Sequence, residues 1–197
     1  MLTSGKDTLH LGCADWPIST KLDGGVGDHL HADMCMWYNN QTDSHLYKFD
    51  GYDIRDEIII KLKENLIFTK CSLYSPLSPI PDDRKYDFIL IPETIEHVDN
   101  VKAFLQSLIH LVKNFQSKIL ITTPNVFAAQ NIHNNRVIDG KFREVVHPDH
   151  NCYYSAYTLP NAIRKAFSST HMVKFFNIGS IEDDSTLFTL FSIYPLR

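Results

Sequence analysis

The sequence lacks the features that would place the protein in a membrane or on nucleic acid. No apolar run approaches the roughly 20 residues that a membrane helix requires, and residues 1–7 are polar, so we expect neither a membrane span nor a secretory signal. The net charge is −4, from 19 Lys and Arg residues against 23 Asp and Glu residues. Phosphate binding usually requires a basic surplus, so nucleic acid is not expected as the main partner.

Cysteine is scarce and unpaired in the sequence. The four cysteines are Cys13, Cys35, Cys71 and Cys152, and no two of them form a CxxC motif. Their spacing indicates neither a zinc knuckle nor a disulfide framework. We therefore expect free, largely buried thiols in a reducing compartment, which for this chain means the cytoplasm.

Strand-like and helix-like segments alternate along the 197 residues. The predicted strands are Thr8–Gly12, His45–Asp53, Leu66–Cys71, Tyr86–Pro92, Lys118–Thr122, His171–Ile178 and Leu187–Tyr194. The predicted helices are His29–Tyr38, Ile54–Glu64, Asn100–Asn114 and Thr158–Phe167. A chain of this length closes one core and has little left for a second, so residues 1–197 are expected to form a single domain.

The pattern of these segments predicts an α/β fold with a mostly parallel sheet. YDFILIP at 86–92 is an uninterrupted apolar run, as in strands that are buried on both faces of a parallel sheet. Strands that alternate with helices imply right-handed βαβ crossovers. The last two strands follow one another without a helix, which predicts an antiparallel hairpin at the C-terminal edge of the sheet.

Two residues at predicted strand ends have the chemistry of a ligand site. In open α/β sheets a ligand lies beyond the carboxyl ends of the strands, where the strand order reverses. Gly12 ends the first predicted strand, and its backbone can approach a ligand closely because glycine has no Cβ. Asp53 ends the second, where a carboxylate can accept both hydroxyls of a ribose. The long polar loops at 15–40 and 126–152 are further expected locations, since loops of this length are usually functional or disordered.

Five segments, taken in order, resemble class I S-adenosylmethionine-dependent methyltransferases. They are LHLGCADWP (9–17), GYDI (51–54), YDFILIPETIEHV (86–98), KILITTPN (118–125) and HPDHNCYYSAYTL (147–159). The resemblance extends in order over nearly the whole chain, and it is closest to the branch with ExxEH and TTPN strand ends. The resemblance implies a Rossmann-like three-layer αβα sandwich with a seven-stranded sheet, and S-adenosyl-L-methionine as the cofactor.

The same resemblance implies which residues bind the cofactor. The turn at Gly12, with Cys13 and Ala14, would face its methionine part. Asp53, followed by Ile54, would hold the ribose, and Cys71 and Ser72 would lie near the adenine. Pro92 and Glu93 would lie beside the sulfonium.

The first loop departs from the family pattern, which usually reads acid-x-Gly-x-Gly-x-Gly. His10 stands in place of the acid, and Ala14 and Trp16 stand in place of the second and third glycines. Cys71 replaces the aspartate on the adenine side. These departures concern cofactor affinity rather than the fold, and they leave open a non-catalytic relative of the family.

An acidic and imidazole cluster follows the fourth predicted strand. Glu93 and Glu96 are three positions apart, which places them on one helical face with His97 beside them. Two carboxylates and an imidazole suit Mg²⁺, Mn²⁺ or Fe²⁺ better than a thiol-binding metal. His150, with His147 as its rival, is the expected fourth ligand.

This cluster is similar to the metal site of small-RNA 3′-terminal 2′-O-methyltransferases and of ubiquinone-pathway O-methyltransferases. The resemblance implies that a bound metal lowers the pKa of a substrate hydroxyl and aims its oxygen at the methyl group. In the metal-free alternative, Glu96 and its neighbours are structural, and His97 or His150 is the general base.

The leading functional hypothesis is methyl transfer to a small polar acceptor, most simply a hydroxyl on a sugar or another metabolite. This acceptor class rests on the resemblance alone, because a fold does not determine chemistry. Two alternatives remain at this point: a methyltransferase-like protein that binds a partner without catalysis, and an RNA 2′-O-methyltransferase.

Overall fold

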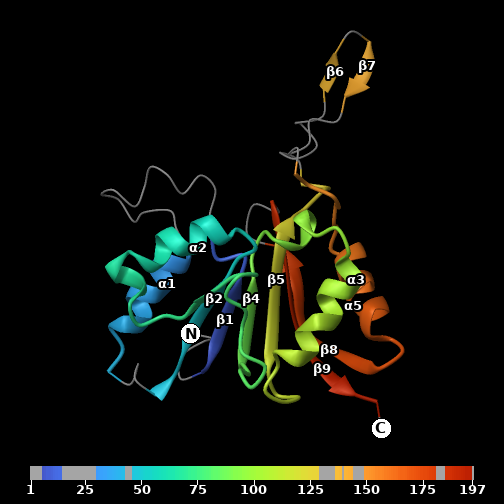
Figure 1. The fold of residues 1–197 in the computed structure, drawn as a ribbon. Coiled ribbons are helices and arrows are strands. Elements are labelled where there is room, and N and C mark those ends of the chain that lie inside the picture. The colour runs from blue at the N-terminus through green and yellow to red at the C-terminus, as the bar shows by residue number, and fades with distance from the viewer. Residues whose placement is uncertain are drawn as a thin grey trace. The chain divides into compact units, whose positions relative to one another are not determined.

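A computed structural model describes residues 6–14, 30–42, 46–128, 136–138, 140–143, 149–180 and 185–196. In this part of the chain seven strands form one sheet in the order β3-β2-β1-β4-β5-β9-β8 (Figure 1). The expected α/β class, with a mostly parallel sheet and an antiparallel C-terminal hairpin, is confirmed. No helix in these ranges is long and apolar enough to cross a membrane.

The chain's internal contacts group it into two compact units. The first unit comprises Met1–Leu90 with Leu111–Asn114, and the second comprises Ile91–His110 with Phe115–Arg197. Asp53 lies in the first unit, and Glu96, His97 and His150 lie in the second.

The strands of the first unit run parallel. β1 (Thr8–Leu11) lies between β2 (Phe49–Tyr52) and β4 (Phe88–Ile91), and β2 also pairs with β3 (Leu73–Tyr74). All residues of β1 and β4 are buried, and burial on both faces explains why β4 is an uninterrupted apolar run. The strand order reverses at β1, so the carboxyl ends of β1, β2 and β4 are where a ligand is expected.

Two helices of the first unit share a hydrophobic cluster. α1 (Leu30–Asn39) and α2 (Asp56–Lys63) both contribute buried side chains to it. Its buried members are Cys13, Ala14, Ala32, Cys35, Tyr38, Phe49, Ile58, Ile59, Leu62, Phe68 and Leu73. The cluster thus fixes both helices to the end of β1, where the first candidate site lies.

The third predicted strand is wrong. Residues Leu66–Phe68 form a short 3₁₀ helix, η2, and the strand follows it at Leu73–Tyr74. The Asn65 side chain accepts a hydrogen bond from the Ile67 backbone N–H at 3.0 Å and caps the helix. Asparagine commonly competes for backbone groups in this way, so a capped turn replaces the strand that the apolar residues suggested.

His10, which replaces the family's acid, is part of a buried histidine pair. Its Nδ1 lies 3.1 Å from Nδ1 of His31 on α1, so one ring donates a hydrogen bond and the other accepts it. Both residues are almost completely buried. The side chain at position 10 therefore links β1 to α1.

A buried ion pair supports β2 from its other end. Asp50 is 1% exposed and accepts hydrogen bonds from the Arg84 guanidinium at 2.6 and 2.8 Å and from the Tyr86 hydroxyl at 2.9 Å. The carboxylate is thus paired and hydrogen-bonded, as a buried charge must be to be tolerated.

The strands of the second unit are antiparallel. β5 (Lys118–Pro124) pairs with β9 (Thr186–Pro195), and β9 pairs with β8 (His171–Ser180). The predicted C-terminal hairpin is therefore present. A separate pair of strands, β6 (Arg136–Ile138) and β7 (Lys141–Arg143), lies in the long polar segment that precedes His150.

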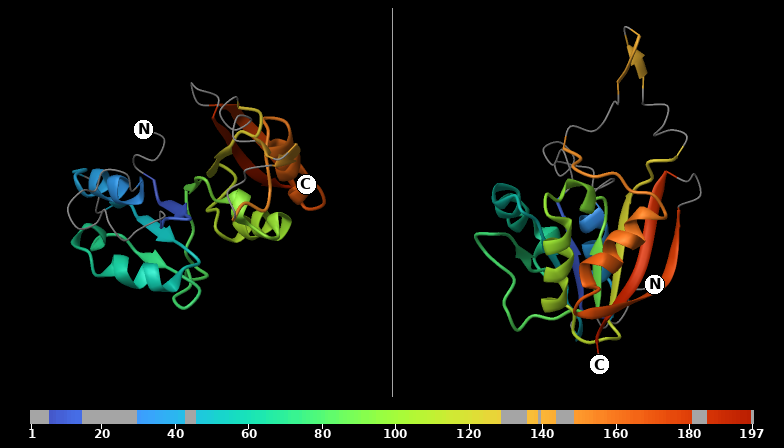
Figure 2. Two further views of the ribbon diagram at one scale, coloured as in Figure 1. Left: turned by 90° about the horizontal axis from the view of Figure 1, so that it is seen from above. Right: turned by 90° about the vertical axis from the view of Figure 1, so that its right-hand side faces the viewer.

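The two helices of the second unit pack together, and α3 ends earlier than expected, whereas α5 has the predicted bounds. α3 (Val101–Ser107) and α5 (Thr158–Phe167) lie side by side (Figure 2), and the Gln106 amide donates to the Ala166 carbonyl at 2.9 Å. The predicted helix over 100–114 is α3 followed by a 3₁₀ turn, η4 (Leu108–His110). Another 3₁₀ turn, η3 (Ile95–His97), follows β4 and carries part of the second site.

Gly51 in β2 allows a close approach that no other residue would permit. A Cβ at this position would lie 2.6 Å from Nε2 of His31 and 2.8 Å from Sγ of Cys13. We predict that Gly51→Ala lowers the free energy of unfolding by about 1–3 kcal/mol, the usual effect of overpacking. Chemical denaturation should show this loss, whereas the exposed Ser72→Ala should stay within about 0.5 kcal/mol of the parent. Equal stability of both variants would contradict the packing argument.

Candidate functional site

The first candidate site is the buried carboxylate of Asp53, just beyond β2. Asp53 is 3% exposed. Its Oδ2 accepts the Ala14 backbone N–H at 3.1 Å, and its Oδ1 accepts the Arg55 backbone N–H at 3.1 Å. The carboxylate thus joins the loop after β1 to the start of α2.

The Arg55 guanidinium occupies the rest of this carboxylate. Its Nε donates to Oδ1 of Asp53 at 2.9 Å and its Nη2 to Oδ2 at 3.2 Å, and Nη2 also contacts the Ala14 carbonyl. A carboxylate offers about four acceptor positions, and these four hydrogen bonds fill them. If the guanidinium left, one position on each oxygen would be freed.

The other residues predicted for the cofactor differ widely in exposure. Gly12 has φ +75°, a left-handed conformation that suits glycine. Cys13 is completely buried, and Ile54 is 75% exposed. Cys71 is half-buried with its thiol 2.9 Å from Sγ of Cys35, and Ser72 is exposed. Their predicted roles toward the cofactor stay predictions.

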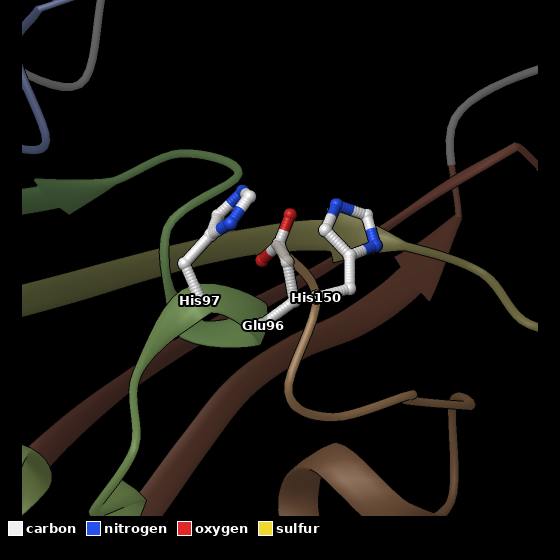
Figure 3. A group of neighbouring side chains, drawn as sticks. All are labelled: Glu96, His97 and His150. Atoms are coloured by element: carbon white, nitrogen blue, oxygen red, sulfur yellow. The ribbon is translucent and has the colours of Figure 1, made fainter. Parts of the chain in front are cut away.

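The second candidate site is a cluster of Glu96, His97 and His150 (Figure 3). One potential ligand atom from each residue lies within 4.8 Å of the other two. The rings of His97 and His150 meet edge to face, with centroids 4.7 Å apart. Two imidazoles and a carboxylate are ligands that a divalent metal accepts.

Backbone hydrogen bonds bring His150 to this cluster from 53 positions along the chain. The Glu96 carbonyl accepts the backbone N–H groups of Asn151 at 2.7 Å and Cys152 at 3.2 Å. The Asn151 amide donates to the His97 carbonyl at 2.9 Å and to the Asp99 carboxylate at 2.8 Å. Asn151 therefore aligns the segment that carries His150 against η3.

Glu96 and His97 differ in burial and in the hydrogen-bond partners of their side chains. Glu96 is 1% exposed, and its Oε2 accepts the Thr123 hydroxyl of β5 at 2.9 Å. Burial raises the pKa of Glu96, while hydrogen bonds from its own backbone and from Thr123 oppose that rise. His97 is exposed, and its Nδ1 lies 3.0 Å from the Asp149 carbonyl. A carbonyl accepts only from N–H, so this contact places a proton on Nδ1 of His97.

Glu93 lies outside this three-residue group within the described ranges, although the sequence predicted four ligands. It precedes η3 and has φ +40°, a left-handed conformation that side chains rarely adopt. Thr122 of β5 holds it there: the Glu93 N–H donates to the Thr122 carbonyl at 3.1 Å, and the Thr122 hydroxyl donates to Glu93 Oε1 at 2.8 Å. The assignment of Glu93 as a metal ligand stays a prediction.

Sequence reasoning missed the residues that position both sites. Arg55 pairs with Asp53, and Asn151 anchors the loop that carries His150. Their only signal was proximity: Arg55 stands two residues after Asp53, and Asn151 directly follows His150. His147 and Trp16, which the sequence also singled out, lie outside the described residues.

The comparison with protein families identifies the family to which the chain belongs. A family model described as a methyltransferase domain matches residues 19–166. The chain belongs to this methyltransferase family. No curated protein matches this methyltransferase.

Solved structures share the fold of this methyltransferase. The methyltransferase domain of bacterial CtHen1-CN is 20% identical, with a TM-score of 0.56 over 95% of this chain and 90% of that one. The plantazolicin methyltransferase BamL, in complex with a triazolic desmethylPZN analog and SAH, is 13% identical, with a TM-score of 0.63 over 95% and 76%. A methyltransferase from Mesorhizobium loti is 11% identical, with a TM-score of 0.60 over 98% and 93%. At these identities the likeness shows the fold.

The ionisation of Glu93 predicts a pH dependence. Its side chain reaches the surface, yet partial loss of hydration, followed by repulsion from Glu96, raises the pKa of Glu93 from 4.5 to about 7. The folded chain therefore favours the protonated form. The stabilisation that this gives is complete below pH 4.5 and is lost as the pH rises through 7.

We predict that the Glu93 carboxyl carbon titrates near pH 7 in NMR spectra recorded with chelator present. Thr122→Val should move this midpoint higher, because the Thr122 hydroxyl stabilises the charged form. Glu93→Gln should weaken the decline of melting temperature between pH 4.5 and 7. A midpoint near 4.5 in the parent protein would refute the assignment.

Proposed function

We propose that this protein transfers a methyl group from S-adenosylmethionine to a hydroxyl of a small polar acceptor, such as a sugar or another metabolite. The observation that carries the proposal is the cluster of Glu96, His97 and His150, which combines a buried carboxylate with two imidazoles beyond β4. Such a cluster can make a hydroxyl nucleophilic, whereas a chain that only bound a partner would not need it. Membership of a methyltransferase family supports the reaction type.

The residues at the end of β2 fit the ribose of the cofactor once Arg55 moves. Withdrawal of the Arg55 guanidinium frees one acceptor position on each oxygen of Asp53, and a ribose presents two adjacent hydroxyls. The Arg55 side chain is 28% exposed, so it has an open direction in which to move. Bound S-adenosylmethionine would supply an electrophilic methyl group, and Asp53 would fix its position.

The second cluster fits a divalent cation, Mn²⁺ or Mg²⁺. Glu96 would contribute a carboxylate oxygen, and His97 and His150 a ring nitrogen each. The contact between His97 Nδ1 and the Asp149 carbonyl is the kind of outer contact that orients metal-binding histidines. A cation bound here would lower the pKa of an acceptor hydroxyl.

An acceptor hydroxyl needs a group that takes its proton. In a cluster without metal, His97 or His150 would be that base, since an imidazole ordinarily titrates near neutral pH. Because Nδ1 of His97 donates to the Asp149 carbonyl, Nε2 would be the ring atom that takes the proton or, with metal bound, the ring atom that binds it.

Two alternatives make different predictions. A non-catalytic relative would bind neither S-adenosylmethionine nor its demethylated product, as the altered loop with Ala14 allows. An RNA 2′-O-methyltransferase would bind RNA with a steep salt dependence. The net charge of −4 disfavours the second alternative.

We predict that Asp53 and Arg55 affect cofactor affinity in opposite directions. Asp53→Ala should weaken binding of S-adenosylhomocysteine by roughly 10- to 100-fold, because charged hydrogen bonds to both ribose hydroxyls are lost. Arg55→Met should tighten binding by about two- to fivefold, because the Arg55 ion pair no longer competes with the ribose for Asp53 and a partly exposed ion pair contributes that much. Isothermal calorimetry measures both effects.

Arg84→Met is the matched control for Arg55→Met. Arg84 pairs with the buried carboxylate of Asp50, so its loss should lower the melting temperature without changing cofactor affinity. Absence of binding by the parent protein would favour the non-catalytic alternative. Equal affinity of the parent and Asp53→Ala would remove Asp53 from the ribose site.

We predict that protein purified without chelator and dialysed against Mn²⁺ retains about one ion per chain in elemental analysis. His97→Ala should reduce metal affinity by roughly 10-fold or more, because one ligand of a three-residue set is lost. The exposed His110→Ala, in the same unit but outside the cluster, should retain the metal. Equal manganese content in the parent and His97→Ala would refute the metal site and leave the general-base role.

A further inference from the structure

Cys35 and Cys71 bring two thiols together from separate segments of the first unit. Cys35 lies on the buried side of α1, and Cys71 lies in the turn between η2 and β3. Their sulfur atoms are 2.9 Å apart although the residues are 36 positions apart in the chain. A disulfide has an S–S bond of about 2.05 Å, so the two sulfurs would need to approach by less than about 1 Å.

Solvent reaches only one of these two thiols. Cys35 is completely buried, whereas Cys71 is partly exposed. The hydrogen bond with Cys71, followed by burial, raises the pKa of Cys35 well above its ordinary value. Thiolates, not thiols, attack disulfides, so Cys71 is the residue that an external oxidant meets first.

Hydrogen bonds and packing around the pair keep the Cys71 and Cys35 sulfurs close together. The Cys71 N–H donates to the Phe68 carbonyl at 3.0 Å, and Phe68 belongs to the same hydrophobic cluster as Cys35. The next residue, Ser72, accepts the Gly51 N–H of β2 at 2.9 Å through its carbonyl. The turn is therefore anchored on both sides of Cys71.

We propose that Cys71 and Cys35 form a reversible disulfide when the protein meets a low-molecular-weight disulfide such as oxidised glutathione. The Cys71 thiolate attacks one sulfur of oxidised glutathione, forms a mixed disulfide and releases one glutathione thiolate. Cys35 then passes its proton to the released glutathione thiolate, and its sulfur attacks the Cys71 sulfur and displaces the second glutathione as a thiolate, which takes up the proton that Cys71 had lost. Two electrons pass from the two protein thiols to one oxidised glutathione, which becomes two molecules of reduced glutathione.

This disulfide would couple the redox state to cofactor binding, a consequence that rests on the proposed function. Position 71 lies on the side expected to face the adenine, and the new bond draws its sulfur toward buried Cys35. Oxidation therefore removes the only described thiol of the first unit that solvent reaches, and it weakens binding of S-adenosylhomocysteine. Disulfides that form reversibly in a reducing compartment are characteristically regulatory.

Differential alkylation of the full-length chain tests the bond itself. After equilibration with oxidised glutathione, two of the four cysteines should be protected, and peptide mapping should identify them as Cys35 and Cys71. The melting temperature should rise by roughly 5 °C, because the bond closes a long loop, and dithiothreitol should reverse both effects. Four free thiols, or a bond that involves Cys13 or Cys152, would overturn the proposal.

Three variants separate the steps. Cys35→Ala should retain one glutathione on Cys71, because the resolving thiol is missing, and Cys71→Ala should carry none on Cys35, which is completely buried. Cys152→Ala, in the second unit, should oxidise like the parent protein. Uptake of glutathione by Cys71→Ala at Cys35 would contradict the order of the steps.

Calorimetry on the same samples tests the coupling. Oxidised parent protein should bind S-adenosylhomocysteine at least threefold more weakly than reduced protein, and Cys71→Ala should show no change on oxidation. Equal affinity of both redox forms would overturn the coupling. Absence of binding by the reduced protein would instead refute the proposed function. Peptide mapping would still test the disulfide, because it does not depend on cofactor binding.

Discussion

The second candidate site depends on the two ends of one residue, Glu96. Its buried carboxylate accepts the Thr123 hydroxyl of β5, and its carbonyl accepts the two backbone N–H groups that follow His150. A buried carboxylate without partners would be strongly disfavoured, so these bonds constrain the strand, the 3₁₀ turn and the distant loop together. His97 directly follows Glu96 in the chain, and His150 directly precedes Asn151. The hydrogen bonds of Asn151 to the Glu96 and His97 carbonyls therefore bring the two histidines together.

Asp53 has the same role in the first unit. It joins the loop after β1 to the start of α2, as Glu96 joins β5 to the loop of His150. The two carboxylates differ in what remains available. Asp53 has all its acceptor positions filled by protein donors, while Glu96 shares a cluster with two imidazoles. The first is therefore a closed network of hydrogen bonds, whereas the second is a group of three side chains that could hold a metal ion.

The fold followed from the sequence wherever burial alone determined an element. Every residue of β4 is buried, so its apolar run identified it; β1 is equally buried, although Thr8 and His10 interrupt its apolar residues. Local hydrogen bonding defeated the same reasoning at Leu66–Phe68, where the Asn65 cap makes a turn of an apolar run. The helix expected to reach Asn114 breaks into α3 and η4 for reasons that hydrophobic spacing does not encode.

The candidate sites were predictable by residue type and place, but not by partner. Asp53 stands at a strand end, and the histidines stand in recognisable motifs. The ion pair with Arg55 and the contact between Cys35 and Cys71 depend on which rotamers and segments meet in the folded chain. No periodicity in a single sequence carries that information, because those partners come from elements with separate hydrophobic patterns.

The left-handed backbone at Glu93 has a consequence for how this chain tolerates change. A side chain in that conformation costs roughly 1–3 kcal/mol, and glycine would avoid the cost. Backbone conformation alone therefore favours glycine at position 93, and glutamate there lowers the stability of the folded chain. A sequence selected only for thermal resistance would therefore be expected to lose this carboxylate early.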